Sequence, residues 1–237
     1  MRKYLFKKTL AKGLIKSRPN RFLMIVEVKG KKKRCHCPAT GRIGDVNLPG
    51  TPCLLSESKG GKRKTKCTVE AISINHKEWI GINQTRVNDY VAFFLRTGQL
   101  NQIIKVNKLK REVPLGNSRI DFLINDRHYL EVKTPLNLIR AQPQNTEQTV
   151  RHTSMDRMIK HLNDASKSVS RGSRAIFILC HMFAAPKFQV PPHTKQENKI
   201  IRTARMADRR GLEHWQLNLK VDPEGVTIID CFPLKLF

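Results

Sequence analysis

The chain has 237 residues, of which 39% are hydrophobic, so it can build a core and is not a disordered basic tail. Its 45 Lys and Arg residues against 19 Asp and Glu give a formal net charge of +26, and both halves of the chain are basic. This excess favours a polyanion such as a nucleic acid as the partner, although a general solubility effect also yields basic surfaces. Lysines interrupt the N-terminus and the longest apolar run is far too short for a bilayer, so we expect a cytoplasmic protein without a membrane segment.

The N-terminal third reads as short strands separated by glycine and proline turns. Residues 1–20 are predicted to be a basic lead-in that ends at Pro19-Asn20. Closely spaced strands with such turns favour a small barrel, and an OB-type barrel is one economical solution. The predicted strands are 22–28, 31–37, 53–56, 67–74 and 78–82.

Two basic runs, 29–34 and 62–66, fall in or beside turns of this predicted barrel. They are either a solvated, charge-protected hairpin edge or a groove that follows the phosphates of a nucleic acid. The residues of these runs that we select as candidate nucleic-acid contacts are Lys31, Lys32, Lys33, Arg34, Lys62, Arg63, Lys64 and Lys66.

The six cysteines show no spacing typical of a disulfide framework. Cys35-His36-Cys37, with Cys53 and Cys67, invites a metal interpretation. However, a single-residue gap between cysteines does not match a zinc pattern, and alternation along a strand turns His36 away from both neighbours. We therefore expect reduced cysteines and no zinc site.

The rest of the chain predicts a mixed α/β domain. Apolar residues at three- and four-residue spacing between Val87 and Leu95 predict a helix, with Thr85 as its cap and Gly98 beyond its end. We place a domain boundary between residues 82 and 85, giving domains 1–82 and 85–237. The further predicted elements are an extended segment 103–115, a hairpin 118–134, a loop 137–152, a helix 154–165, a strand 175–180, a loop 186–197, an arginine-rich helix 200–210, and strands 215–221 and 226–229.

The hairpin carries the candidate site. Its alternating pattern and its turn at Asn125-Asp126-Arg127, centred on residue 126, pair position 122 with 130 and 124 with 128, so that Asp121 faces Glu131 across the strands. Lys133 lies on the same face. Two opposed carboxylates repel each other unless a cation or a shared proton lies between them, and a divalent metal is the useful cation. The alternative is a salt-bridged patch on a solvated sheet face.

Asp121 followed by Glu131-Val132-Lys133 resembles the motif of the PD-(D/E)xK nuclease superfamily. Over nearly its whole length the chain is similar to the sugar fermentation stimulation protein A (SfsA) family. This resemblance implies an N-terminal OB-fold, a nuclease-like C-terminal α/β domain and DNA binding, and it adds Arg21, Arg42 and Arg119 to the candidate nucleic-acid contacts. The matching residues include Asn20-Arg21-Phe22, Pro38, Gly41-Arg42, Pro49-Gly50, Arg63-Lys64-Thr65, Asn88, Arg111-Glu112-Val113, Ser118-Arg119 and Lys160-His161-Leu162.

The same resemblance implies a catalytic set of Asp121, Glu131 and Lys133. The two carboxylates would ligate Mg²⁺ or Mn²⁺ with the backbone carbonyl of Val132, and Glu112 is a further candidate ligand. Lys133 would orient the attacking water and stabilise the developing negative charge. Relatives tend to carry a glutamate in the first helix where this chain has Ala92. The resulting hypothesis is a DNA-binding protein with a nuclease-type site, and the alternatives are a non-catalytic DNA-binding regulator of sugar metabolism genes or an RNA-binding module.

Overall fold

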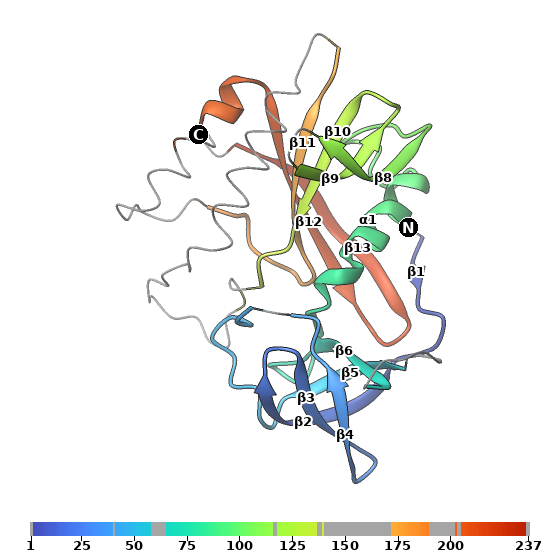
Figure 1. Ribbon diagram of the computed structural model, residues 1–237, viewed down its shortest axis with the longest axis vertical. Coiled ribbons are helices and arrows are strands. Elements are labelled where there is room, and N and C mark those ends of the chain that lie inside the picture. Colours follow the sequence, from blue (N-terminus) through green and yellow to red (C-terminus); the bar gives the residue numbers. More distant parts are fainter. Residues whose placement is uncertain are drawn as a thin grey trace.

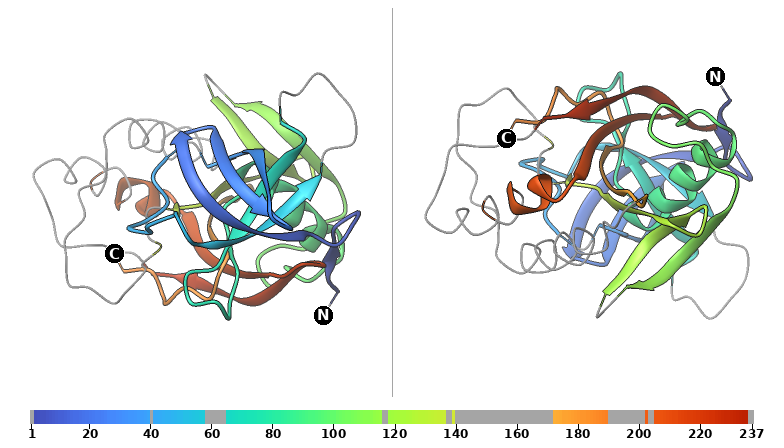
Figure 2. Two further views of the ribbon diagram at one scale, coloured as in Figure 1. Left: turned by 90° about the horizontal axis from the view of Figure 1, so that it is seen from below. Right: turned by 90° about the horizontal axis from the view of Figure 1, so that it is seen from above.

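The computed structural model describes residues 2–39, 41–57, 65–115, 118–136, 139, 172–189, 202 and 205–235. In this part of the chain two sheets lie end to end, with a small barrel below a larger sheet (Figure 1). Figure 2 shows the barrel strands in front of the larger sheet when the molecule is seen from below. The mixed α/β fold with an N-terminal OB-like barrel, predicted from the strand pattern, is confirmed.

The barrel is closed by one parallel pairing. Its strands run in the order β4-β3-β2-β5-β6 with antiparallel neighbours, and β4 then pairs with β6 at Cys35 opposite Cys67. Closure removes the exposed edges that a five-stranded sheet would otherwise leave. The strands are β2 (Ala11–Asn20), β3 (Leu23–Val28), β4 (Lys31–His36), β5 (Pro52–Glu57) and β6 (Cys67–Ile72), and β7 (Ile80–Gly81) pairs with β6.

The predicted lead-in over residues 1–20 is wrong, because β2 occupies half of it at the centre of the barrel sheet. The strand pairs with β5 through its first half and with β3 through its second half. Of its side chains only Ile15 is fully buried, so the alternation that marks a strand is faint in the sequence. β1 (Tyr4–Leu5) pairs with β13 and so belongs to the larger sheet.

The larger sheet has the order β1-β13-β12-β11-β10-β9-β8. The three central strands β10, β11 and β12 are parallel, and the other neighbours are antiparallel. The carboxyl ends of parallel strands meet at one edge of a sheet, so polar residues near those ends lie close together. The strands are β8 (Leu109–Leu115), β9 (Ser118–Ile124), β10 (His128–Lys133), β11 (Ala175–His181), β12 (Leu212–Val221) and β13 (Gly225–Leu234).

The predicted helix is α1 (Val87–Arg96), preceded by a 3₁₀ turn, η1 (Gln84–Arg86). Tyr90, Val91 and Phe94 are buried on one side of α1 and join the main hydrophobic cluster. Gly98 follows with a φ of +74°, as a helix terminator does. Thr85 is not the cap: its hydroxyl donates to Asn83 Oδ1 at 2.6 Å, and the α1 N-cap residue, Arg86, makes no side-chain capping bond.

The barrel and the larger sheet share one hydrophobic cluster of buried residues. At their junction the Gly81 N–H donates to the Met182 carbonyl at 2.9 Å. A Cβ on Gly81 would lie 2.6 Å from Cβ of Met182, so only glycine permits this approach. The boundary between residues 82 and 85 remains a prediction, and the two parts pack as a continuous body in the described chain.

The remaining predicted elements are described in part. The strand 175–180 and the two late strands correspond to β11, β12 and β13. Residue 202 and residues 205–209 are helical, within the predicted arginine-rich helix. The predicted loop 137–152, apart from residue 139, and the predicted helix 154–165 lie outside the described residues. Among the residues that are described, no helix is long and apolar enough to cross a membrane.

Candidate functional site

The hairpin of β9 and β10 has the predicted register, with Phe122 opposite Leu130 and Ile124 opposite His128. Asn125 and Asp126 have φ values of +53° and +57°, which is the conformation of a type I′ turn. Beyond this ladder, side chains replace the backbone pairing. Asp121 Oδ2 accepts from the Val132 N–H at 2.7 Å, and Glu131 Oε2 accepts from the Asp121 N–H at 3.3 Å. The two carboxylates therefore lie side by side where the strands part.

Lys133 completes this group. Its Nζ lies 2.5 Å from Glu131 Oε1, and the Glu131 side chain is only 3% exposed, whereas that of Lys133 is 29% exposed. Glu131 thus contacts both of the other residues selected from the sequence: it accepts from the Asp121 N–H and pairs with the Lys133 ammonium group. The ion pair of the alternative interpretation exists, but it is not on a solvated face, because its carboxylate is buried.

A fourth residue reaches the site from α1. Asn88 Nδ2 donates to Asp121 Oδ1 at 2.7 Å, so both oxygens of Asp121 are held. Asn88 was noted in the sequence only as part of the family resemblance, because nothing in its local pattern shows which strand α1 packs against. Ala92, one turn further along α1, is buried.

Burial, and after it the neighbouring charge of Glu131, raise the pKa of Asp121 to about 6. The bonds from the Val132 N–H and from Asn88 oppose this rise, since they favour the ionised carboxylate. An ionised Asp121 is therefore held at an energetic cost near neutral pH. A bound cation would relieve that cost.

The donor set fits a hard divalent cation. Asp121 and Glu131 offer carboxylate oxygens, and the Val132 carbonyl points toward β9 as its N–H does, because both groups of one residue face the same side of a strand. Within the described residues no group of three or more His, Cys, Asp or Glu side chains could hold a metal. Mg²⁺ nevertheless suits a site with one or two carboxylates, because it retains several waters. Glu112 lies on β8, exposed and with a φ of +52°, so its part in the site remains a prediction.

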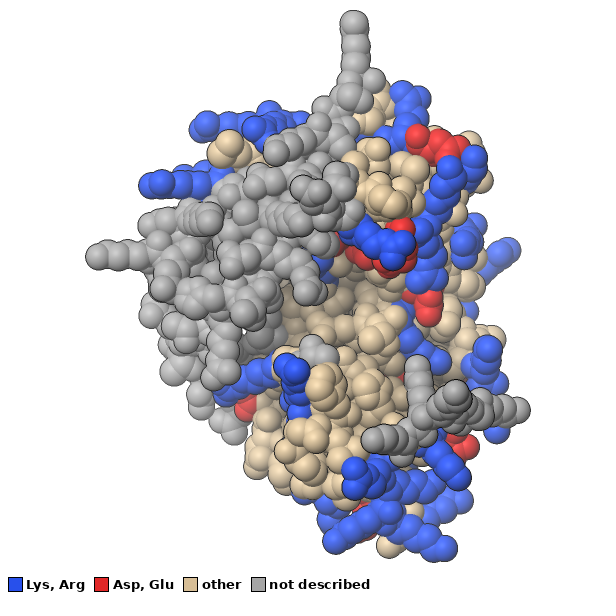
Figure 3. All heavy atoms as spheres, in the orientation of Figure 1, with Lys and Arg blue, Asp and Glu red and all other residues tan. Residues whose placement is uncertain are grey.

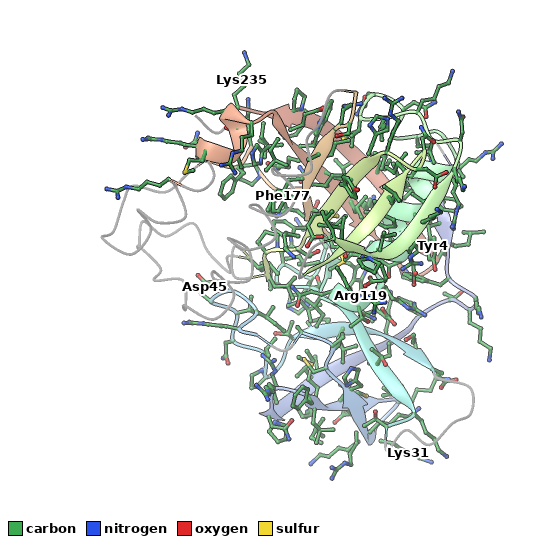
Figure 4. All side chains as sticks on the ribbon, turned by 45° about the horizontal axis from the view of Figure 1, so that its top comes forward. Tyr4, Lys31, Asp45, Arg119, Phe177 and Lys235 are labelled. Atoms are coloured by element: carbon green, nitrogen blue, oxygen red, sulfur yellow. The ribbon has the colours of Figure 1, made fainter. Side chains whose placement is uncertain are left out.

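The candidate nucleic-acid contacts that the structure describes do not form one patch. The strand β4 carries four of them in succession, Lys31, Lys32, Lys33 and Arg34. Figure 3 shows basic side chains gathered at this end of the barrel. Figure 4 places Lys31 at the outer end of the barrel and Arg119 near the centre of the molecule. Four other candidates are exposed: Arg21, Arg42, Lys66 and Arg119. The remaining three, Lys62, Arg63 and Lys64, lie outside the described residues.

The barrel cysteines are core residues. Cys35, Cys37, Cys53 and Cys67 are buried. Burial raises the pKa of the Cys35 and Cys53 thiols to about 12, so both remain protonated and unreactive at neutral pH.

His181 is a buried polar residue on the site face of the sheet. It lies two residues beyond Leu179, whose Cα pairs with that of Lys133. Its side chain packs edge-on against Phe183. His181 is 3% exposed and neither ring nitrogen has a hydrogen-bond partner in the described structure. Burial lowers its pKa to about 4.

This burial predicts a pH-dependent stability. The folded protein holds the His181 ring neutral, so the pH-dependent part of its contribution to stability is fully present above pH 6.5 and is lost as the pH falls from 6.5 through 4. Relative to His181→Leu, we expect the free energy of unfolding of the wild-type protein to fall by about 2 kcal/mol between pH 7 and pH 5. Urea unfolding of both proteins at the two pH values measures their free energies of unfolding. The contributions of the other titrating groups are the same in both proteins, so they cancel in the difference. Parallel pH profiles would contradict the assignment.

Comparison with known proteins covers the whole chain. Residues 17–82 match the model of the SfsA N-terminal OB domain, and residues 85–225 match that of the sugar fermentation stimulation protein RE domain. A sugar fermentation stimulation protein homolog of Synechococcus sp. (strain JA-2-3B'a(2-13)) is 31% identical over 227 residues, which cover 94% of this chain and 92% of the relative. A homolog of Clostridium novyi (strain NT) is 28% identical over 218 residues, covering 90% and 92% of the two chains.

Among solved structures, SfsA of Pyrococcus furiosus in complex with Ca²⁺ has a TM-score of 0.75 and 23% identity, with full coverage of both chains. At this identity the likeness concerns the fold alone. The family is established by the domain model that matches residues 85–225, which is more than half of the chain, and by the near full-length relatives. The chain belongs to the sugar fermentation stimulation protein family.

Proposed function

We propose that this protein binds DNA and hydrolyses phosphodiester bonds with a divalent metal ion, Mg²⁺ or Mn²⁺, at Asp121, Glu131 and Lys133. The observation that carries the proposal is the grouping of two carboxylates and a lysine where β9 and β10 part, with Glu131 bonded to both the Asp121 N–H and Lys133. The charge of +26 supports a polyanionic substrate. The Ca²⁺ bound in the Pyrococcus furiosus relative adds support, since Ca²⁺ and Mg²⁺ are both hard cations that take oxygen ligands.

A bound divalent ion supplies an acidified water and neutralises charge on the scissile phosphate. Asp121, Glu131 and the Val132 carbonyl would hold this ion. Asn88 fixes the Asp121 carboxylate in one orientation through Oδ1. Lys133 brings a positive charge to the mouth of the site, where its ammonium group can donate to the attacking water and to the oxygen that gains negative charge.

Cleavage assays test the proposal directly. Labelled single-stranded DNA, double-stranded DNA and RNA are incubated with the protein in Mg²⁺, Mn²⁺ or EDTA. We expect cleavage of DNA with either metal and none in EDTA. Lys133→Ala should bind DNA but not cut it, whereas Lys110→Ala, which removes an exposed lysine paired with Asp126, should behave as wild type. Binding without cleavage in both metals would leave a non-catalytic DNA-binding protein, and preference for RNA would indicate an RNA-binding module.

The basic strand β4 leads to a second prediction. Replacing Lys31, Lys32 and Arg34 with Ala removes exposed charges at the barrel end. We expect weaker binding to every DNA sequence and a salt dependence whose slope falls by about 1 for each lost phosphate contact. Titrations at several salt concentrations measure this slope. Wild-type affinity that does not change with salt would exclude a phosphate-tracking surface.

A further inference from the structure

Phe22, in the turn between β2 and β3, is the one aromatic side chain among the exposed large apolar residues of the described chain. It is 46% exposed, and the others, Leu5, Met206 and Ile229, are not aromatic. The Arg21 guanidinium carbon lies 4.6 Å from the centre of the Phe22 ring. A cation over the ring stabilises this pair and leaves ring surface open to solvent.

The turn that carries Phe22 is held on both sides. The Phe22 N–H donates to Asn20 Oδ1 at 2.9 Å, and the Phe22 carbonyl accepts from the Cys37 N–H at 2.8 Å. Arg18 Nη2 donates to the carbonyls of Arg21 at 3.2 Å and of Ala39 at 2.6 Å. The ring is therefore presented on a backbone that is already ordered, so that a ligand would meet little entropic cost on binding.

Arg18 also fixes the neighbouring basic residue. Its Nη2 donates to the Gly41 carbonyl at 3.1 Å, directly before the exposed Arg42. This end of the β3–β4 ladder thus combines an open aromatic ring with the cations of Arg21 and Arg42. The register places it at the opposite end of that ladder from Lys31, which is labelled in Figure 4.

We propose that Phe22 is a stacking platform for an unpaired base of single-stranded DNA, with Arg21 and Arg42 contacting the adjoining phosphates. An aromatic ring among cations recognises a planar π-face joined to negative charge, which is the chemistry of a nucleotide. Bases inside a duplex are stacked on each other and cannot reach the ring. The inference rests on the proposed DNA binding and specifies its ligand: the barrel takes a single strand.

Binding is measured in EDTA, by fluorescence anisotropy, with a single-stranded DNA, an abasic strand of the same length and a duplex. We expect Phe22→Ala to weaken binding of the base-containing strand at least about fivefold, and to leave the abasic strand and the duplex unchanged. Phe22→Leu keeps apolar volume without a π-face and should show the same loss. Ile229→Ala is the control for removing an exposed apolar side chain and should bind as wild type.

Phe22→Trp provides an independent readout, because its emission should be quenched by the base-containing strand and not by the abasic one. Equal affinity of wild type and Phe22→Ala for the base-containing strand would overturn the inference while leaving DNA binding intact. An equal loss for the abasic strand, or a Phe22 dependence seen only with RNA, would overturn it as well. A wild-type protein that binds none of the strands at low salt would overturn the proposed function itself.

Discussion

Asp121→Asn should abolish the stabilisation of the protein by Mg²⁺ or Mn²⁺ and should not destabilise the metal-free protein at pH 7.5. The pKa of Asp121 is raised to about 6 from an ordinary 3.8, so its contribution to stability is fully present below pH 3.8 and is lost as the pH rises through 6. At neutral pH the buried, ionised carboxylate of Asp121 lowers the stability of the fold. The uncharged side-chain amide of an asparagine at this position removes that cost. Asn88 can turn its own amide to donate or accept, so the bond between the two side chains survives the substitution.

The stabilisation of the wild-type protein by Mg²⁺ or Mn²⁺ should be large. A ligand that binds only the native state, at about a thousand times its Kd, stabilises it by about 4 kcal/mol, which is roughly 8 to 16 °C in Tm for a chain of this size. Glu131→Gln should also lose the response, and it should lower Tm because Lys133 loses its charged partner. Thermal melts with and without metal measure both effects.

Asp126→Asn is the matched control. Asp126 is a carboxylate in the turn of the same hairpin, and hydrogen bonds from Lys108 and Lys110 lower its pKa. Its removal should leave the metal response intact. A flat melting temperature of the wild-type protein in Mg²⁺ and Mn²⁺ would end the nuclease proposal and leave DNA binding. A full response in Asp121→Asn would place the ion elsewhere.

The sequence predicted the elements whose signals are local. The hairpin was predictable because the three turn residues between Ile124 and His128 set the register, and the register brings Asp121 beside Glu131 and Lys133. The helix α1 was predictable because one of its sides is apolar along its whole length. The strand β11 was predictable because its residues form a continuous apolar run, which reflects burial of both faces in the middle of a sheet.

The elements that were missed depend on contacts between distant segments. β2 is a strand because β3 and β5 hold it from both sides, and its own residues are largely polar and glycine-containing. Asn88 joins the site only because α1 packs beside β9, a contact across 33 residues of sequence. Thr85 follows a local helix-start pattern, but the 3₁₀ turn η1 places the beginning of α1 after it.

Glu70 is a further residue that sequence reasoning did not select, and its removal should cause a large loss of stability. It lies on β6, its side chain is 2% exposed, and Oε1 forms an ion pair with Arg86 Nη1 at 3.3 Å. Asn83 Nδ2 donates to Oε2 at 2.7 Å, and the Ser56 hydroxyl donates to Oε1. One buried carboxylate thus ties two barrel strands to the residues that lead into α1.

Glu70→Ala should lower the free energy of unfolding by about 3–5 kcal/mol, because it leaves the Asn83 amide and the half-buried Arg86 without their acceptor. Glu70→Gln keeps an acceptor for Asn83 but not the charge, so we expect a smaller loss. Asp89→Ala is the control, since it removes a carboxylate paired with Arg111 at 2.7 Å near the surface and should cost about 0–1 kcal/mol. Denaturant unfolding of the three variants gives these values. Equal losses for Glu70→Ala and Asp89→Ala would mean that the junction between barrel and helix is held by apolar packing rather than by this carboxylate.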